Sequence, residues 1–146
     1  IQQRGSTSLA VISTSFIYAL VHFLQPETYP DPNTLNWLSG FTVLKNAFSS
    51  LLQPMQIVDS FIALFLAGAL LAIIRIRTDS LAMCIGMHAG WVFIIKIFRR
   101  VTNSNENSDY AFLTGSYDQV IGYLAAVCVT LAIIIYIGMK NRSQTN

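Results

Sequence analysis

Charged side chains are scarce in this sequence. Lysine, arginine, aspartate and glutamate make up 11% of its 146 residues, against roughly a quarter in an ordinary soluble domain. The mean hydropathy of +0.53 is typical of a polytopic membrane protein. The formal net charge is only +2, and the basic residues stand singly or in pairs rather than in a patch, so no nucleic-acid partner is expected.

Cysteine is equally rare. The two cysteines, Cys84 and Cys128, both lie inside apolar runs, which argues against a disulfide framework and against a CxxC metal site. We interpret them as packing residues.

Long apolar runs are what the sequence does contain. A membrane-spanning helix needs about 20 apolar residues, and four runs approach that length. The segment 37–52 mixes apolar with polar residues at helical spacing, which favours an interfacial or re-entrant helix. The expected fold is an all-α, polytopic membrane helical bundle of about four spans plus this one helix. The predicted spans are 7–24, 57–76, 79–98 and 120–139.

Polar segments separate these runs. Residues 27–36 are rich in proline and predict a turn-rich loop, and residues 101–116 are rich in asparagine and serine and predict a connector. We expect a single domain over 1–140 and a disordered tail over 141–146. Counting basic residues on each side barely separates the two orientations, and we take Arg4 as cytoplasmic.

Only two histidines occur, and each lies within an apolar run. An imidazole at membrane depth costs free energy unless it has a partner, so His22 and His88 are candidate functional residues. The other interpretation is that each bonds a carbonyl or a serine on a neighbouring helix and only stabilises packing. Gly86 and Gly90 form a GxxxG pattern in the predicted span 79–98, on a different face from His88. Such a pattern favours the close approach of another helix.

Two histidines do not complete a hydrolytic site. A site of this kind usually adds a carboxylate as general base, or a third metal ligand. No acidic residue lies in a predicted span near either histidine, because Asp59 and Asp79 stand at helix ends. The residues alone therefore leave the carboxylate unassigned.

The order of these motifs resembles the CPBP family of membrane endopeptidases, which includes CAAX prenyl proteases and bacteriocin-processing or immunity proteins. That family carries EExxxR, FxxxH and HxxxN or HxxxD on successive helices. Tyr18 and His22 match the second motif, with tyrosine in place of phenylalanine. His88 and Val92 match the third, with valine in the polar position. Between these two motifs the sequence has an apolar helix with Gly68 at its centre, followed by the segment RTDSL at 77–81. This order of segments also resembles that of the family.

Arg4 and Gly5 resemble the end of the first motif, which would place its two glutamates immediately before Ile1. The resemblance implies that a glutamate activates water, that His22 and His88 position the water or the oxyanion, and that Arg4 orients the glutamates. Because Val92 cannot form a hydrogen bond, either another group substitutes or turnover is weakened.

The sequence is therefore interpreted as the C-terminal part of an intramembrane endopeptidase in a bacterial-type plasma membrane, acting on a peptide or protein substrate within the lipid bilayer. No tightly bound metal is expected, although two histidines and a glutamate form a possible zinc site. The main alternative is a catalytically inactive scaffold or immunity-type binding protein of the same fold. A small transporter fragment with proton-relay histidines ranks last.

Overall fold

The computed structural model describes residues 2–24, 31–48, 50–52, 54–103, 105, 107–115 and 119–143. Within these ranges the chain forms helices, turns and loops without a strand, which confirms the predicted all-α class. The elements are α1 (Gln2–His22), η1 (Pro32–Thr34), α2 (Ser39–Ala47), η2 (Ser50–Leu52), α3 (Pro54–Thr78), α4 (Leu81–Val101), η3 (Ala111–Leu113) and α5 (Tyr123–Ser143).

Three of these helices are long and apolar enough to cross a membrane. Their apolar stretches are Gly5–His22 in α1, Met55–Thr78 in α3 and Leu81–Val101 in α4. The apolar stretch of α5, Tyr123–Met139, is shorter and lies at the lower limit of about 17 residues for a span. The described residues thus form a helical bundle of the membrane-spanning type.

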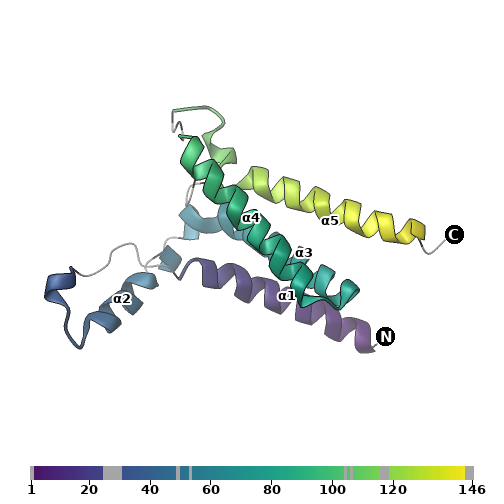
Figure 1. The fold of residues 1–146 in the computed structure, drawn as a ribbon, viewed down its shortest axis with the longest axis horizontal. Coiled ribbons are helices and arrows are strands. Elements are labelled where there is room, and N and C mark those ends of the chain that lie inside the picture. The colour runs from purple at the N-terminus through teal and green to yellow at the C-terminus, as the bar shows by residue number, and fades with distance from the viewer. Residues whose placement is uncertain are drawn as a thin grey trace.

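Helix α3 is the centre of the bundle. Helices α1 and α5 pack along it, and α4 runs obliquely across it (Figure 1). Helices α1 and α3 approach each other closely at Gly68, where an added Cβ would lie 3.0 Å from Cδ1 of Tyr18 and 3.1 Å from the Cα of Ser15. A buried cluster continues this contact through Ala19, Phe23, Ile57 and Leu64.

A tight turn joins α3 to α4. Asp79 has a φ of 51° and its carboxylate pairs with Arg75 one turn earlier. The next residue, Ser80, caps α4 by accepting a hydrogen bond from the backbone N–H of Met83, as short polar side chains do at helix N-termini. The chain therefore reverses at once, and α4 returns past α3.

Helix α2 is separate from the bundle and points away from it (Figure 1). It has nine residues, a length of about 14 Å at 1.5 Å per residue, so it does not cross a bilayer. This agrees with the prediction that 37–52 is not a span. Helix α5 continues to Ser143, into the segment predicted as a tail, and residues 144–146 lie outside the described ranges.

Among the described residues, no helix packs against the GxxxG pattern of α4. A Cβ added at Gly86 or Gly90 would meet nothing within 4 Å among the described residues. Helix α4 instead packs on α3 through another face, where the thiol of Cys84 lies 3.5 Å from the carbonyl oxygen of Leu71. Within the described residues a helix approaches closely at Gly68, and close approach at Gly86 and Gly90 stays a prediction.

Candidate active site

The two histidines come together in the fold. His22 is the last residue of α1 and His88 lies in the second turn of α4, yet their ring centroids are 6.4 Å apart with the planes at 78°. The tight α3–α4 turn and the oblique course of α4 set the path of the helix that carries His88 (Figure 1). His22 is exposed and His88 is half-buried, so the pair is accessible.

Tyr18 links the two histidines. Its hydroxyl lies 3.0 Å from Nδ1 of His88, and its ring centroid is 4.4 Å from that of His22. The same side chain packs against Gly68 of α3, which limits its rotation. Tyr18 is thus fixed by α3 and bonded to α4, and it holds the His88 ring relative to α1.

The hydrogen bond of His22 determines its tautomer. Nδ1 lies 2.7 Å from the backbone carbonyl oxygen of Tyr18. A carbonyl oxygen only accepts hydrogen bonds, so Nδ1 carries the proton and donates. In the neutral ring Nε2 then has a free lone pair, which can accept a proton from water or bind a metal.

His88 can adopt the opposite tautomer, with its proton on Nε2. When the phenol of Tyr18 donates to Nδ1, the neutral imidazole carries its proton on Nε2. That N–H can donate to a carbonyl oxygen or to an oxyanion. One ring of the pair then presents an acceptor and the other presents a donor, which is a suitable pair for holding a water beside a carbonyl group.

Arg4 and Val92, the other two motif positions, do not contact the histidine pair through polar groups. Arg4 lies near the start of α1, 18 positions before His22, a distance of about 27 Å along a helix rising 1.5 Å per residue. This separation exceeds the reach of an arginine side chain, and the side chain itself lies outside the described residues. Val92 stands one turn after His88 and is 37% exposed, but it has no group that could form a hydrogen bond.

The described residues do not supply a third metal ligand beside the histidines. Among them, no group of three or more histidine, cysteine, aspartate or glutamate side chains is placed to hold a metal ion. The buried acidic residue of α3, Asp59, accepts a hydrogen bond from the backbone N–H of Ser60. Among the described residues, neither histidine forms a hydrogen bond or ion pair with a carboxylate.

The phenol–imidazole bond was not foreseen from the sequence. The match to FxxxH drew attention to the ring of Tyr18, but the hydroxyl is the atom that reaches His88. The sequence feature that could have predicted this hydrogen bond is the tyrosine in the phenylalanine position of FxxxH, because it adds a polar group to an apolar helix. Such a group needs a partner at membrane depth.

Comparison with known proteins identifies the family of the chain. A family model described as type II CAAX prenyl endopeptidase, Rce1-like, matches residues 1–94. The match includes α1, α2, α3 and most of α4, and with them His22, His88 and Tyr18. No curated protein and no solved structure matches the chain. The family match covers well over half of the sequence and supports the earlier resemblance to CPBP endopeptidases, and the chain is an integral membrane protein that belongs to the Rce1-like family of type II CAAX prenyl endopeptidases.

Proposed function

We propose that this chain forms the histidine part of a membrane-embedded endopeptidase, in which His22 and His88 position the water that hydrolyses a peptide bond. The observation that carries the proposal is the meeting of the sequence's two histidines on α1 and α4, with ring centroids 6.4 Å apart. Two unrelated packing histidines would have no reason to share one place. Membership of the Rce1-like family supports the reaction class.

The proposed reaction assigns a role to each side chain. A glutamate outside the described residues takes a proton from water, and the water oxygen attacks the carbonyl carbon of the peptide bond. Nε2 of His22 accepts a hydrogen bond from that water, and Nε2–H of His88 donates to the oxyanion that forms. The glutamic acid then returns its proton to the leaving nitrogen, and the C–N bond breaks.

The substrate class follows from the family. A peptide or protein at the membrane is the general expectation, and the family description makes a prenylated carboxyl-terminal peptide the first substrate to test. The cluster lies between apolar helices, so a substrate held by a lipid-like group would approach it from within the bilayer.

The test compares cleavage of a farnesylated peptide by the purified protein in detergent with cleavage by His22→Gln and His88→Gln. We expect kcat/KM to fall at least about 100-fold in both, which is the usual contribution of a positioned proton-transfer or polarising group. Lys96→Gln, an exposed residue on the same helix as His88, is the control and should retain activity. Unchanged cleavage in either histidine variant would refute the proposed role.

We also propose that the reaction does not depend on a tightly bound metal, because the described residues offer only two histidine ligands at the cluster. Dialysis against a strong chelator should leave cleavage unchanged. A loss that zinc restores, with metal bound in equal molar ratio, would contradict this proposal and identify a third ligand elsewhere in the protein.

The second candidate is a catalytically inactive scaffold or immunity-type binding protein with the same fold. Val92 favours it, because the polar residue of the third motif is missing. In that case the wild type does not cleave the peptide, and His22→Gln and His88→Gln lower thermal stability without any other effect.

A further inference from the structure

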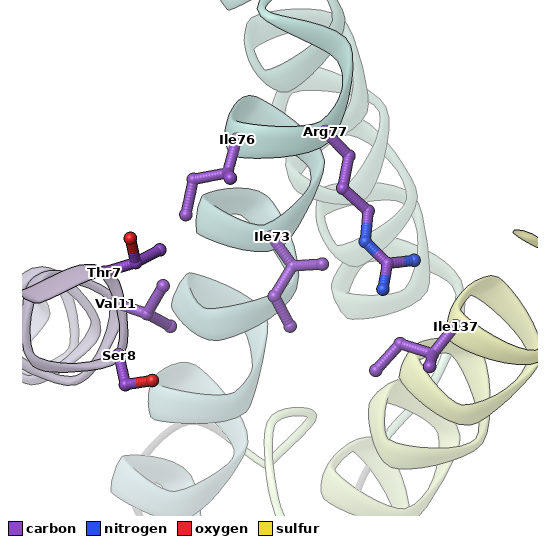
Figure 2. A pocket seen from close by; sticks show the side chains of 7 residues that line it. All are labelled: Thr7, Ser8, Val11, Ile73, Ile76, Arg77 and Ile137. Atoms are coloured by element: carbon purple, nitrogen blue, oxygen red, sulfur yellow. The ribbon is translucent and has the colours of Figure 1, made fainter. Parts of the chain in front are cut away.

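A second concave site lies at the opposite end of α1 from the histidines. It is a trough of about 350 Å³ between α1, α3 and α5. Its floor includes Ile73 and Arg77 of α3, one wall includes Ser8 and Val11 of α1, and Ile137 of α5 forms the other wall (Figure 2). Val11 is 11 positions before His22, about 16 Å along the helix, so the α3 trough is separate from the candidate active site.

Arg77 is held in place within the α3 trough. Its guanidinium lies 5.4 Å from the ring centroid of Tyr136 and 3.5 Å from that residue's carbonyl oxygen. In the part of the chain the structure describes, no carboxylate forms an ion pair with Arg77, whereas Arg75 pairs with Asp79. The trough therefore contains a half-buried, oriented cation that lacks a negative partner there.

The depth of the trough indicates where such a partner would come from. Arg77 stands one residue before the end of the apolar stretch Met55–Thr78, so in a bilayer its guanidinium lies at the level of the lipid phosphates. Below the guanidinium the floor is apolar, and Ile73 separates Arg77 from the α1 wall (Figure 2). This combination of a cation at the interface and an apolar surface beneath it matches an amphiphilic anion.

The size of the trough limits its occupant. A volume of about 350 Å³ is at the lower end of the roughly 300–1,000 Å³ of ligand pockets, enough for a headgroup but not for acyl chains. Thr7 and Ser8 line the α1 side of the trough, across Ile73 from Arg77 (Figure 2). A guanidinium binds phosphate oxygens in a bidentate manner, and basic pockets between membrane helices bind anionic headgroups.

We propose that the α3 trough binds the headgroup of an anionic phospholipid, with Arg77 contacting the phosphate and the acyl chains lying against the apolar helix surfaces below. The site does not depend on the proposed peptidase reaction. A bound lipid there would fix α1 and α5 against α3 at this end of the bundle.

The test is lipid retention, measured by native mass spectrometry on the purified chain released from detergent. Phosphatidylglycerol and phosphatidylcholine with identical acyl chains are compared. We expect one phosphatidylglycerol to be retained with a dissociation constant at least about fivefold lower, the preference that one basic residue supplies at a membrane surface. Arg77→Gln should remove this preference, and Arg75→Gln, the exposed arginine two positions earlier, should keep it.

Two further variants distinguish a loss of lipid binding from misfolding. Arg77→Lys keeps the charge and should keep the preference, whereas Ile137→Trp fills the trough without altering any charge and should remove it. The proposal is overturned if Arg77→Gln or Ile137→Trp retains the preference while remaining folded, or if Arg75→Gln loses it equally. It is also overturned if free glycerol phosphate competes as well as the lipid, which would mark a simple anion site, or if a farnesylated peptide displaces the lipid, which would assign the trough to substrate.

Discussion

Tyr18 carries a hydroxyl at a position where the endopeptidase pattern has phenylalanine, and Val92 lacks the polar group that the pattern has at its own position. Both departures concern the motifs that contain or contact His88. The hydroxyl reaches Nδ1 of His88 from α1, while residue 92 stands on the same face of α4, one turn after His88. We infer that Tyr18 orients His88 in place of the missing asparagine or aspartate.

This inference gives a prediction for Tyr18→Phe. Removing the hydroxyl leaves the ring packed on Gly68 and frees the His88 imidazole to rotate. We expect kcat for peptide cleavage to fall about five- to tenfold, the equivalent of one hydrogen bond of about 1–1.5 kcal/mol, with KM little changed. Tyr123→Phe, which removes a hydroxyl at the start of α5, is the matched control. Equal effects of the two substitutions would rule out a special role for Tyr18.

A rescue experiment separates positioning from general destabilisation. Asparagine at residue 92 can reach His88 from the following turn, so Val92→Asn should restore most of the kcat lost in Tyr18→Phe when the two are combined. By itself, Val92→Asn should change kcat little, because the hydroxyl already orients the ring. If the double variant is no more active than Tyr18→Phe, the two groups do not share a function.

For single residues, the sequence indicated that His22 and His88 are candidate functional residues. It did not indicate that the hydroxyl group of Tyr18 links them. Histidines in apolar runs need hydrogen-bond partners, and this requirement can be inferred from a single sequence. The Tyr18–His88 contact joins residues 70 positions apart, and it depends on how α4 is rotated about its axis. Arg4 lies 18 positions before His22 in the same helix, and the role that the resemblance implies for it, orienting the glutamates, stays a prediction.

The α1–α3 interface depends on one glycine. At Gly68 a Cβ would approach backbone and ring atoms at 3.0–3.1 Å, whereas Gly90 has open space around it. The helices can therefore approach closely only while residue 68 lacks a side chain, and Tyr18 is positioned by that approach.

Gly68→Ala should consequently lower stability. Crowding in a packed interface costs about 1–3 kcal/mol, and the gain in helix propensity of up to about 1 kcal/mol offsets only part of it. We expect a net loss of about 1 kcal/mol in detergent unfolding, together with reduced peptide cleavage because Tyr18 is displaced. Gly90→Ala should instead gain up to about 1 kcal/mol. Shifts of the same sign in both variants would contradict the role of Gly68.

Element types were well predicted, and element contacts were not. Apolar length identified α1, α3 and α4, and the mixed pattern of 37–52 correctly predicted a helix that does not span. Small-residue spacing is common to packed and lipid-facing surfaces, so GxxxG did not distinguish Gly86 and Gly90 from the single Gly68. The limits of α5 were uncertain for a similar reason, since a helix apolar on every face has no pattern that marks its ends.

Over the whole molecule, apolar side chains remain exposed along every long helix. None of the residues of α4 is buried, and large hydrophobic residues such as Phe93, Ile134 and Leu9 are more than half exposed. In water this surface would be strongly unfavourable, while in a bilayer it faces acyl chains. The chain therefore owes its stability to the lipid around it as well as to the α1–α3 and α3–α5 contacts.

The order of the membrane-spanning helices predicts on which side of the membrane each connecting segment lies. If α1, α3 and α4 each cross once, Leu35 and Asn103 lie on one side of the membrane and Thr78 lies on the other. We test this with single cysteines at these three positions in a background of Cys84→Ala and Cys128→Ala, labelled by an impermeant maleimide in intact cells and in inverted vesicles. Leu35→Cys and Asn103→Cys should react from the same side, and Thr78→Cys should react only from the opposite side. Reaction of Thr78→Cys together with Asn103→Cys would show that α4 does not cross, and then His88 could not meet His22 within the bilayer.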